Sequence, residues 1–341
     1  MSRITDLLRL EHPIVQGPFG GGLSSVALAA AVSNAGGLGS FGAQHLAPKE
    51  LTATIRALHA ATDRAFNVNL WVSTHDVPED DYDGWDQAAA KLRPLYDELG
   101  VPAPARPRPA AHAFTPLVEA LIAARPPVFS FVYGVPPAPV LEACRAAGIV
   151  TVGTAITVEE AVALDQAGVD AIVASGFEAG GHRVAFLRAA EDSLIGTLAL
   201  VPAVVDAVGA PVIAAGGIAD RRQVQAALAL GAEAVQVGSA FLATRQSAAH
   251  PLHREQLAHG RRTTRLTKAL SGRLARGLET AITTREAVAP FPYQSALMRP
   301  IIAAAYEQGR TDLIGFWAGQ STPLVRPDRD AVELLHDLSP A

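Results

Sequence analysis

The sequence predicts a (β/α)8 barrel with an inserted segment after the third strand and a mainly helical C-terminal cap. The chain has 341 residues, of which 49% are hydrophobic, so it can bury a large core. Eight short apolar runs each precede a helical pattern, and such alternation is typical of a parallel sheet. Eight strands in an open sheet would leave two unpaired edges, and closure into a barrel removes both.

The predicted strands follow one another along the whole first part of the chain. They cover residues 13–17, 38–42, 66–70, 128–134, 149–153, 171–176, 212–217 and 234–241. Helix-start signals stand between them. Thr157 with Glu160 and Asp220 with Gln223 have the spacing of capping boxes. Proline favours the first helical position, and the prolines that stand where such a position is expected are Pro48, Pro116 and Pro202.

Three segments are not part of a minimal (β/α)8 barrel: an insert, a long loop and the tail after about Pro251. The insert, about 73–112, contains helical spacing over 85–99 and then a proline-rich linker. A long loop over 177–199 is expected to be functional or disordered. We therefore expect a barrel over residues 1–250 and a helical cap over 251–341 that packs on it.

Composition argues against several classes of protein. The net charge of −5 gives no reason to expect binding to nucleic acid or to a membrane surface. The basic residues of the tail are expected to form a solvated, salt-bridged face: Arg261, Arg262, Arg265, Lys268, Arg273 and Arg276. Cys144, the single cysteine, is expected to be packed in a helix, and no secretion signal or membrane span is apparent, so we expect a cytoplasmic protein. No residues show metal-ligand spacing, and nucleophile-elbow, Walker A and Rossmann motifs are missing.

Glycine-rich strand ends predict a phosphate site. The active site of a (β/α)8 barrel lies at the carboxyl ends of its strands, and the loops after strands seven and eight commonly hold phosphate. Here those strands end in AAGGI, with Gly216 and Gly217, and in QVGSA, which spans Gln236, Val237, Gly238 and Ser239. The helix beginning near Asp220 would add its positive dipole end. Glycine also ends strands for steric reasons, and the pattern alone does not identify the ligand.

The sixth strand ends in SGFEAGGH, which places His182 at the barrel mouth as a candidate general base. An imidazole exchanges protons near neutral pH. The alternative is a loop histidine that only bonds to the backbone. Glu178, its neighbour, is expected to have a structural role. At the first and third strand ends, Gly17 to Phe19 and Asn69 are placed to line a flat ring, or else to form a turn and a satisfied core amide.

Seven segments in this order resemble the nitronate monooxygenase family: PIVQGPFGG, NVNLWVS, ASGFEAGGH, PVIAAGGI, GAEAVQVGSAF, SGRLARG and WAGQ. The resemblance covers nearly the whole chain. It implies noncovalent FMN and oxidation of alkyl nitronates, or of nitroalkanes, by O2 to a carbonyl compound and nitrite. It implies a catalytic role for His182. The residues it places at FMN are Gly17, Pro18, Phe19, Asn69, Ser175, Gly180, Gly181, Gly216, Gly217, Gln236, Val237, Gly238 and Ser239.

Three positions depart from many members of that family: Ser175 replaces glutamine, Phe19 replaces methionine and Ser239 replaces threonine. The first two affect the wall beside the flavin and therefore the choice of substrate. The alternatives are an NAD(P)H-dependent flavin reductase on the same barrel, of the enoyl-ACP reductase or quinone reductase type, a flavin-binding module without turnover, and a phosphosugar enzyme without flavin. The oligomeric state, a homodimer included, stays open.

Overall fold

The computed structural model describes residues 2–73, 82–107, 114–258, 263–326 and 328–340, and it confirms the predicted barrel. Eight parallel strands lie in the order β1-β9-β8-β6-β5-β4-β3-β2. Two hydrogen bonds close the ring between β1 and β2, from Gln16 N to Leu38 O and from Leu38 N to Ile14 O, both 2.9 Å. The strands are β1 Ile14–Gln16, β2 Gly39–Gly42, β3 Phe66–Trp71, β4 Val128–Val132, β5 Val150–Ala155, β6 Ala171–Ser175, β8 Val212–Ala215 and β9 Ala234–Val237.

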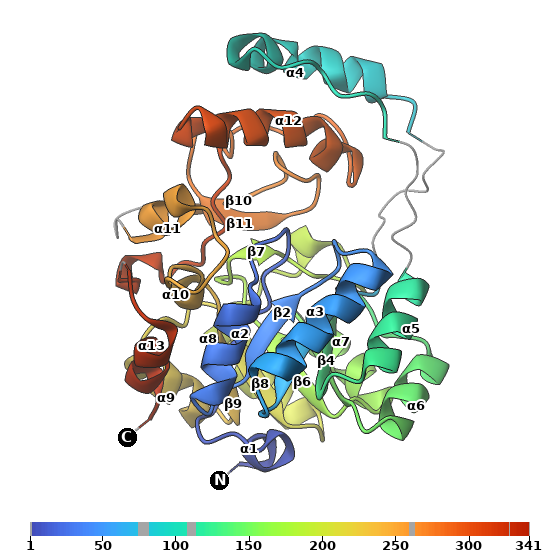
Figure 1. Ribbon diagram of the computed structural model, residues 1–341, viewed down its shortest axis with the longest axis vertical. Coiled ribbons are helices and arrows are strands. Elements are labelled where there is room, and N and C mark those ends of the chain that lie inside the picture. Colours follow the sequence, from blue (N-terminus) through green and yellow to red (C-terminus); the bar gives the residue numbers. More distant parts are fainter. Residues whose placement is uncertain (1, 74–81, 108–113, 259–262, 327, 341) are drawn as a thin grey trace.

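The eighth predicted strand was too long. It ends at Val237 because Gly238, with φ −99° and ψ −85°, leaves the extended region, and the short helix α10 (Ser239–Leu242) follows at once. The helices around the barrel (Figure 1) are α2 Val26–Asn34, α3 Pro48–Ala61, α5 Phe114–Ala124, α6 Ala138–Ala146, α7 Val158–Gln166, α8 Thr197–Ala207 and α9 Arg221–Ala229.

The helix-start predictions are confirmed in part. Asp220 and Gln223 form the expected capping box, and Pro48 is the first residue of α3. Thr157 caps α7, but the Glu160 carboxylate binds the N–H of Ile156 instead of completing the box. The predictions for two prolines are wrong. Pro116 is the third residue of α5, and Pro202 lies inside α8, which begins at Thr197 because the Glu178 carboxylate accepts the hydrogen bonds of that end.

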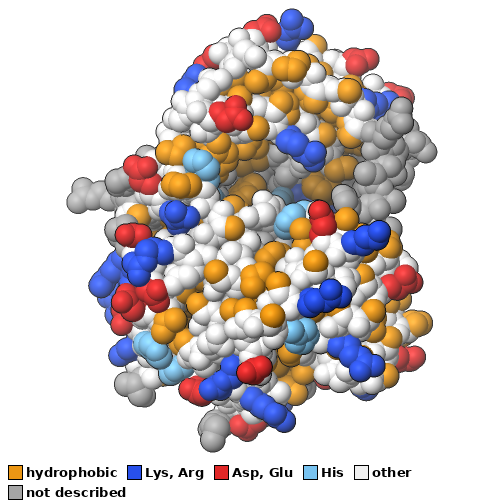
Figure 2. Space-filling view, in the orientation of Figure 1, with side chains coloured by type: hydrophobic (Ala, Val, Ile, Leu, Met, Phe, Trp, Pro, Cys, Tyr) orange, Lys and Arg blue, Asp and Glu red, His pale blue; other side chains and the backbone are white. Residues whose placement is uncertain are grey.

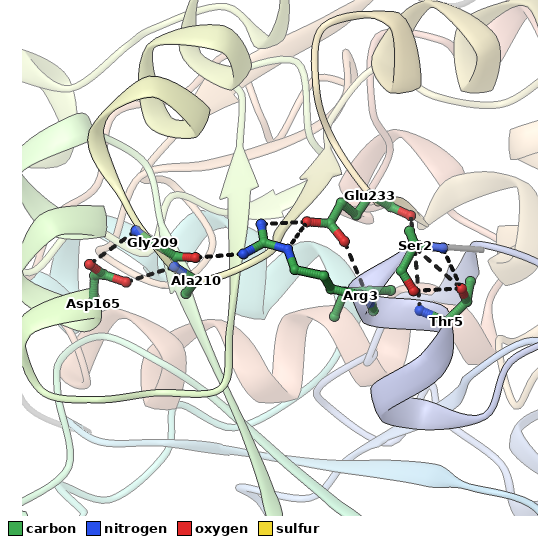
Figure 3. A network of polar contacts seen from close by, with 8 residues as sticks. Ser2, Arg3, Thr5, Asp165, Gly209, Ala210 and Glu233 are labelled. Atoms are coloured by element: carbon green, nitrogen blue, oxygen red, sulfur yellow. Dashed lines mark hydrogen bonds and ion pairs between the residues drawn. The ribbon is translucent and has the colours of Figure 1, made fainter.

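The amino-terminal helix α1 (Arg3–Leu8) plugs the end of the barrel opposite the cap (Figure 1). Ile4 and Leu8 pack against side chains of the barrel interior. Figure 3 shows the polar contacts that hold this plug: the Arg3 guanidinium binds the Glu233 carboxylate and the carbonyl of Gly209, the latter at 2.8 Å. The closed end is therefore built for stability.

Polar side chains occupy part of the barrel interior. Gln16 Oε1 accepts a hydrogen bond from Ser40 N at 2.8 Å, which adds a side-chain link to the β1–β2 seam. Asn67 Nδ2 donates to Ser40 Oγ and Asn69 Nδ2 to Ser130 Oγ. Buried polar groups are retained where they have partners.

The cap combines segments that are distant in sequence. The predicted helix of the insert, α4 (Trp85–Leu99), lies on α12 (Tyr293–Glu307), which separates it from the barrel (Figure 1). Tyr96 Oη donates to Leu297 O, and Gln308 Nε2 donates to Leu99 O, each at 2.9 Å. The tail also holds α11 (Pro251–Ala258), α13 (Ala331–Leu338) and the single-turn helices η2 (Thr311–Leu313) and η3 (Thr322–Leu324).

A small sheet was not predicted. The hairpin β10 (Thr264–Thr267) and β11 (Ala275–Leu278) pairs with β7 (Gly181–His182), a two-residue strand within the long loop 177–199. The same loop contains η1 (Ala190–Asp192). Helix α13 leaves the cap and packs beside α2, α9 and α10 on the barrel.

The plug gives a direct test of stability. We expect Leu8→Ala to lower the free energy of unfolding by about 2–4 kcal/mol, because Leu8 is 3% exposed and its loss leaves a cavity. The matched control is Leu7→Ala on the same helix, where the side chain is 42% exposed and a markedly smaller loss is expected. Urea unfolding of the two variants measures the difference, and equal losses would show that α1 does not plug the barrel.

Candidate active site

A cavity of about 830 Å3 lies between the carboxyl ends of the barrel strands and the cap. Figure 2 shows it as a hollow between the upper and lower parts of the molecule, with hydrophobic side chains inside. His182 and all but one of the thirteen predicted cofactor residues line it. The exception is Val237, whose side chain is buried in the core outside the cavity, while its carbonyl accepts a hydrogen bond from Gly17 N.

The two glycine-rich strand ends present unused donors. Gly216 and Gly217 have φ of 105° and 67°, which L side chains rarely adopt. Within the described residues, the N–H groups of Gly217 and Gly238 donate to no protein acceptor. A Cβ added at Gly238 would meet nothing within 4 Å. Free amides beside open space suit an oxyanion such as phosphate.

Part of the amino-terminal end of α9, which was predicted to support a phosphate through its dipole, is already hydrogen-bonded within the protein. The Asp220 carboxylate already accepts from Gln223 N at 3.2 Å, and Gln223 Oε1 accepts from Ala219 N at 2.8 Å. The capping box that starts α9 thus occupies donors that a ligand would need. Of the donors predicted for this wall, the N–H groups of Gly217 and Gly238 are the ones left without a protein acceptor in the described structure.

The segment 317–321, which includes the WAGQ motif, closes the glycine wall. Gly319 N donates to Ser239 Oγ at 2.8 Å, and Ser321 Oγ donates to Gly217 O at 2.6 Å. Gly180 passes so close that a Cβ on it would lie 2.6 Å from the backbone of Ala318, so only glycine fits there. Residue spacing carried no signal for these contacts.

His182 lies on β7 and not in an irregular loop. It is opposite Ala275 of β11, and its Nε2 is 2.9 Å from Ser271 Oγ. The imidazole also contacts the rings of Trp71 and Trp317, each with its centroid 5.4 Å away. A side-chain hydroxyl and two aromatic rings therefore set the orientation of the imidazole. The sequence assigned no role to these neighbours, although each lies in a segment that carries the family resemblance: NVNLWVS, SGRLARG or WAGQ.

The prediction of a solvated basic face is wrong for two arginines. The Arg273 guanidinium is buried and lies 4.1 Å from the ring centroids of both Tyr133 and Phe291, behind Trp71. Arg276 is also buried, and its Nε donates to Phe177 O at 2.9 Å. Cation–π contacts with neighbouring rings stabilise both buried guanidinium groups. The prediction holds for two others, since Arg265 pairs with Glu279 and Lys268 with Glu191, whereas Arg261 and Arg262 lie outside the described residues.

The loop 177–199 is fastened by charges. Glu178 accepts hydrogen bonds from the backbone N and the hydroxyl of Thr197 at the start of α8, so its predicted structural role is confirmed. Arg183, 2% exposed, donates to the carbonyls of Gly176 and Ser175 at 2.7 and 3.0 Å. Burial lowers the pKa of Arg183 to about 10, and Glu178 opposes that shift. The buried Glu160 accepts from Phe186 N at 2.7 Å.

In the part of the chain that the structure describes, neither the cysteine nor a cluster of metal ligands offers a second reactive centre. Cys144 is buried as predicted, and burial raises the pKa of its thiol to about 11. No set of three histidine, cysteine or acidic side chains within the described ranges is arranged to hold a metal ion. None of the described helices combines the length and apolar character needed to cross a membrane.

Fold and site together are those of a (β/α)8-barrel enzyme with its cavity at the carboxyl ends of the strands. The profile of the nitronate monooxygenase family matches residues 1–340, and the chain belongs to this family of flavin oxidoreductases. A nitronate monooxygenase of Pseudomonas aeruginosa is 41% identical over 98% of this chain and 97% of its own. A probable nitronate monooxygenase of Bacillus subtilis is 34% identical over 99% and 98%.

Solved structures agree with this assignment. The nitroalkane oxidase of Streptomyces ansochromogenes superposes with a TM-score of 0.88 at 36% identity, covering 99% of this chain and 96% of its own. FabK of Thermotoga maritima gives a TM-score of 0.76 at 31% identity, covering 99% and 94%. The barrel, the loop that bears His182 and the cap are therefore parts of one shared architecture.

His253 on α11 gives a prediction about pH. Its Nε2 is 3.1 Å from Trp317 O, and burial lowers its pKa to about 4. Below pH 6.5 the unfolded chain binds a proton here that the folded protein does not bind until about pH 4. The stabilisation is therefore complete above pH 6.5 and is lost as the pH falls toward 4, by about 3 kcal/mol in all.

The variant His253→Gln keeps a donor for Trp317 O but does not titrate. We expect the free energy of unfolding of the wild type to fall by about 2 kcal/mol more than that of the variant between pH 7.5 and pH 5. Urea unfolding at the two pH values measures it, with His59→Gln at an exposed position of α3 as the control. Parallel losses in the wild type and His253→Gln would contradict the assignment.

Proposed function

We propose that the protein binds FMN and oxidises alkyl nitronates, and the parent nitroalkanes, with O2 to a carbonyl compound and nitrite. The observation that carries the proposal is that His182 and both glycine-rich strand ends line one cavity. Membership of the nitronate monooxygenase family and the likeness to a nitroalkane oxidase support the choice of substrate. A small-molecule substrate and a cytoplasmic location fit this activity.

The residues present fit FMN. The free N–H groups of Gly217 and Gly238, with open space at Gly238, would hold the phosphate. Gly17, Pro18 and Phe19 form a wall of backbone and ring atoms that suits a flat isoalloxazine, and Asn69 lines the cavity from β3. The remaining predicted contacts come from Ser175, Gly180, Gly181, Gly216, Gln236 and Ser239, with Val237 acting only through its backbone.

Bound FMN would accept electrons from the substrate and pass them to O2. His182 performs the acid–base part. In its neutral form it takes the proton from the carbon next to the nitro group, and in its protonated form it stabilises the nitronate anion electrostatically. Ser271 holds the imidazole through Nε2, and Trp71 and Trp317 limit its rotation and exclude water from one side.

The phosphate cradle can be tested by a small substitution. We expect Gly238→Ala to weaken FMN binding by about tenfold, which corresponds to about 1.4 kcal/mol, because the added methyl meets ligand and not protein. Quenching of FMN fluorescence on titration with apoprotein measures the affinity. Gly209→Ala is the control, since its Cβ would meet nothing closer than 3.8 Å, far from the cavity. An unchanged affinity for FMN in Gly238→Ala would show that the phosphate does not bind at this wall.

The acid–base role has a separate test. We expect His182→Gln to lower kcat/KM for neutral nitroalkanes by about 10^2- to 10^4-fold, because proton abstraction needs a base. Preformed nitronates need no deprotonation, so their oxidation should fall much less. Oxygen consumption with each substrate form, at equal flavin content, gives the two values. If both forms lost activity equally, His182 would not be the base.

Anaerobic mixing with NADH separates the proposal from the flavin reductase alternative. Under the proposal, the flavin is bleached by a nitronate and not by NADH. Rapid bleaching by NADH would instead assign a reductase. A colourless protein as purified from cells grown with riboflavin, and one that does not bind added FMN, would exclude both.

A further inference from the structure

The cavity has two chemically different walls. The strand-end wall is rich in glycine and carries the polar residues Asn69, Ser175, Gln236 and Ser239. A second, apolar part of the lining, which we call the cap lobe, combines Leu270, Ala296, Ile302 and Tyr306 of the C-terminal cap with Leu23 and Leu242 at the barrel mouth. FMN would occupy the strand-end wall, because that is where the free amides are. The cap lobe then remains open to an apolar group of another ligand.

Helix α12 presents a continuous stripe to the cavity. Ser295, Arg299, Ile302 and Tyr306 are spaced by four, three and four residues, so they lie on one face over about 16 Å. A different face of the helix, with Leu297, Ile301 and Ala305, is fully buried in the core. Since that second face already anchors the helix, the stripe on the cavity is not needed to hold it in place.

The remaining parts of the cap lobe are fixed and uncharged. Leu270 sits directly over Gly315, where any Cβ would collide with its methyl group. The Tyr306 ring packs against His250 at 4.7 Å and Phe316 at 6.3 Å, and burial raises the pKa of its phenol to about 12, so it stays neutral. Arg299, the charged residue of the stripe, is exposed and lies where the hollow meets solvent.

We propose that the cap lobe binds the hydrocarbon chain of the substrate, so that the preferred substrates are nitronates of long, unbranched alkyl chains. This inference rests on the proposed function. The nitro group points toward His182, and the chain lies against the apolar part of α12, at Ala296, Ile302 and Tyr306. Transfer of a chain from water to such a wall is favourable, by about fourfold in binding for each methylene. A short nitronate leaves the lobe unfilled and forgoes that gain.

The first experiment compares the nitronates of nitroethane, 1-nitrobutane and 1-nitrooctane with the flavin-loaded enzyme. We expect kcat/KM to rise by at least about tenfold from the shortest to the longest. We expect Ala296→Leu, which fills the lobe, to lower the ratio of kcat/KM for nitrooctane nitronate over nitroethane nitronate by about tenfold. Ala303→Leu makes the same change seven residues on, at an exposed position outside the cavity, and should leave the ratio unchanged.

A binding measurement complements the kinetics. Isothermal titration of the holoenzyme with 1-octanol, which carries a chain but no nitro group, should show weaker binding in Ala296→Leu than in the wild type and Ala303→Leu. Equal kcat/KM for all chain lengths, with nitroethane nitronate turned over, would overturn the inference and leave the proposed function standing. Identical behaviour of the two leucine variants would do the same. If no nitronate were oxidised while octanol bound in an Ala296-dependent way, the proposed function would fail and the apolar-chain site would stand.

Discussion

The pairing of β7 with β11 is the contact on which the active site depends. It joins Gly181 and His182, which follow the sixth barrel strand, to Ala275 and Arg276 in the tail. The same pairing brings Ser271 to the imidazole and places Arg273 behind Trp71. Without it, His182 would belong to a long loop whose backbone has no fixed direction. The two-residue strand thus gives His182 a rigid backbone support, as the acid–base role proposed for it requires.

Buried charge secures the other side of that loop. Arg183 comes directly after His182, and its guanidinium binds the carbonyl of Ser175, the last residue of β6, and that of Gly176 just after it. Glu160 and Glu178 hold the backbone further along, at Phe186 and at the start of α8. Arg183 and Glu160 would be costly to bury alone, but each is hydrogen-bonded to backbone groups. These hydrogen bonds therefore hold the loop in place on this end of the barrel.

How well each part of the molecule could be predicted depends on how far apart in sequence its interacting residues lie. Strand and helix patterns repeat locally, so the barrel, the helix over 85–99 and the Asp220 capping box could be predicted. The glycines and His182 also lie at strand ends, where the topology alone brings them to one mouth. In contrast, β7 is too short for any periodicity, and the burial of Arg273 depends on rings from three distant segments. Pro202 misled the prediction because Glu178, remote in sequence, starts α8 earlier than the local pattern suggests.

The cap divides two tasks between two faces of one helix. The core face of α12 packs in the cap, where the carbonyl of Leu297 binds Tyr96 of α4, and this face determines whether the cap folds. The cavity face carries Ala296, Ile302 and Tyr306, whose sizes set the room beside the strand-end wall. We expect substitutions on the cavity face, whose side chains are partly buried, to cost less core packing than substitutions on the fully buried core face. With the cap lobe as the proposed chain site, substrate choice could change in this fold while the glycine-rich strand ends and the support of His182 stay as they are.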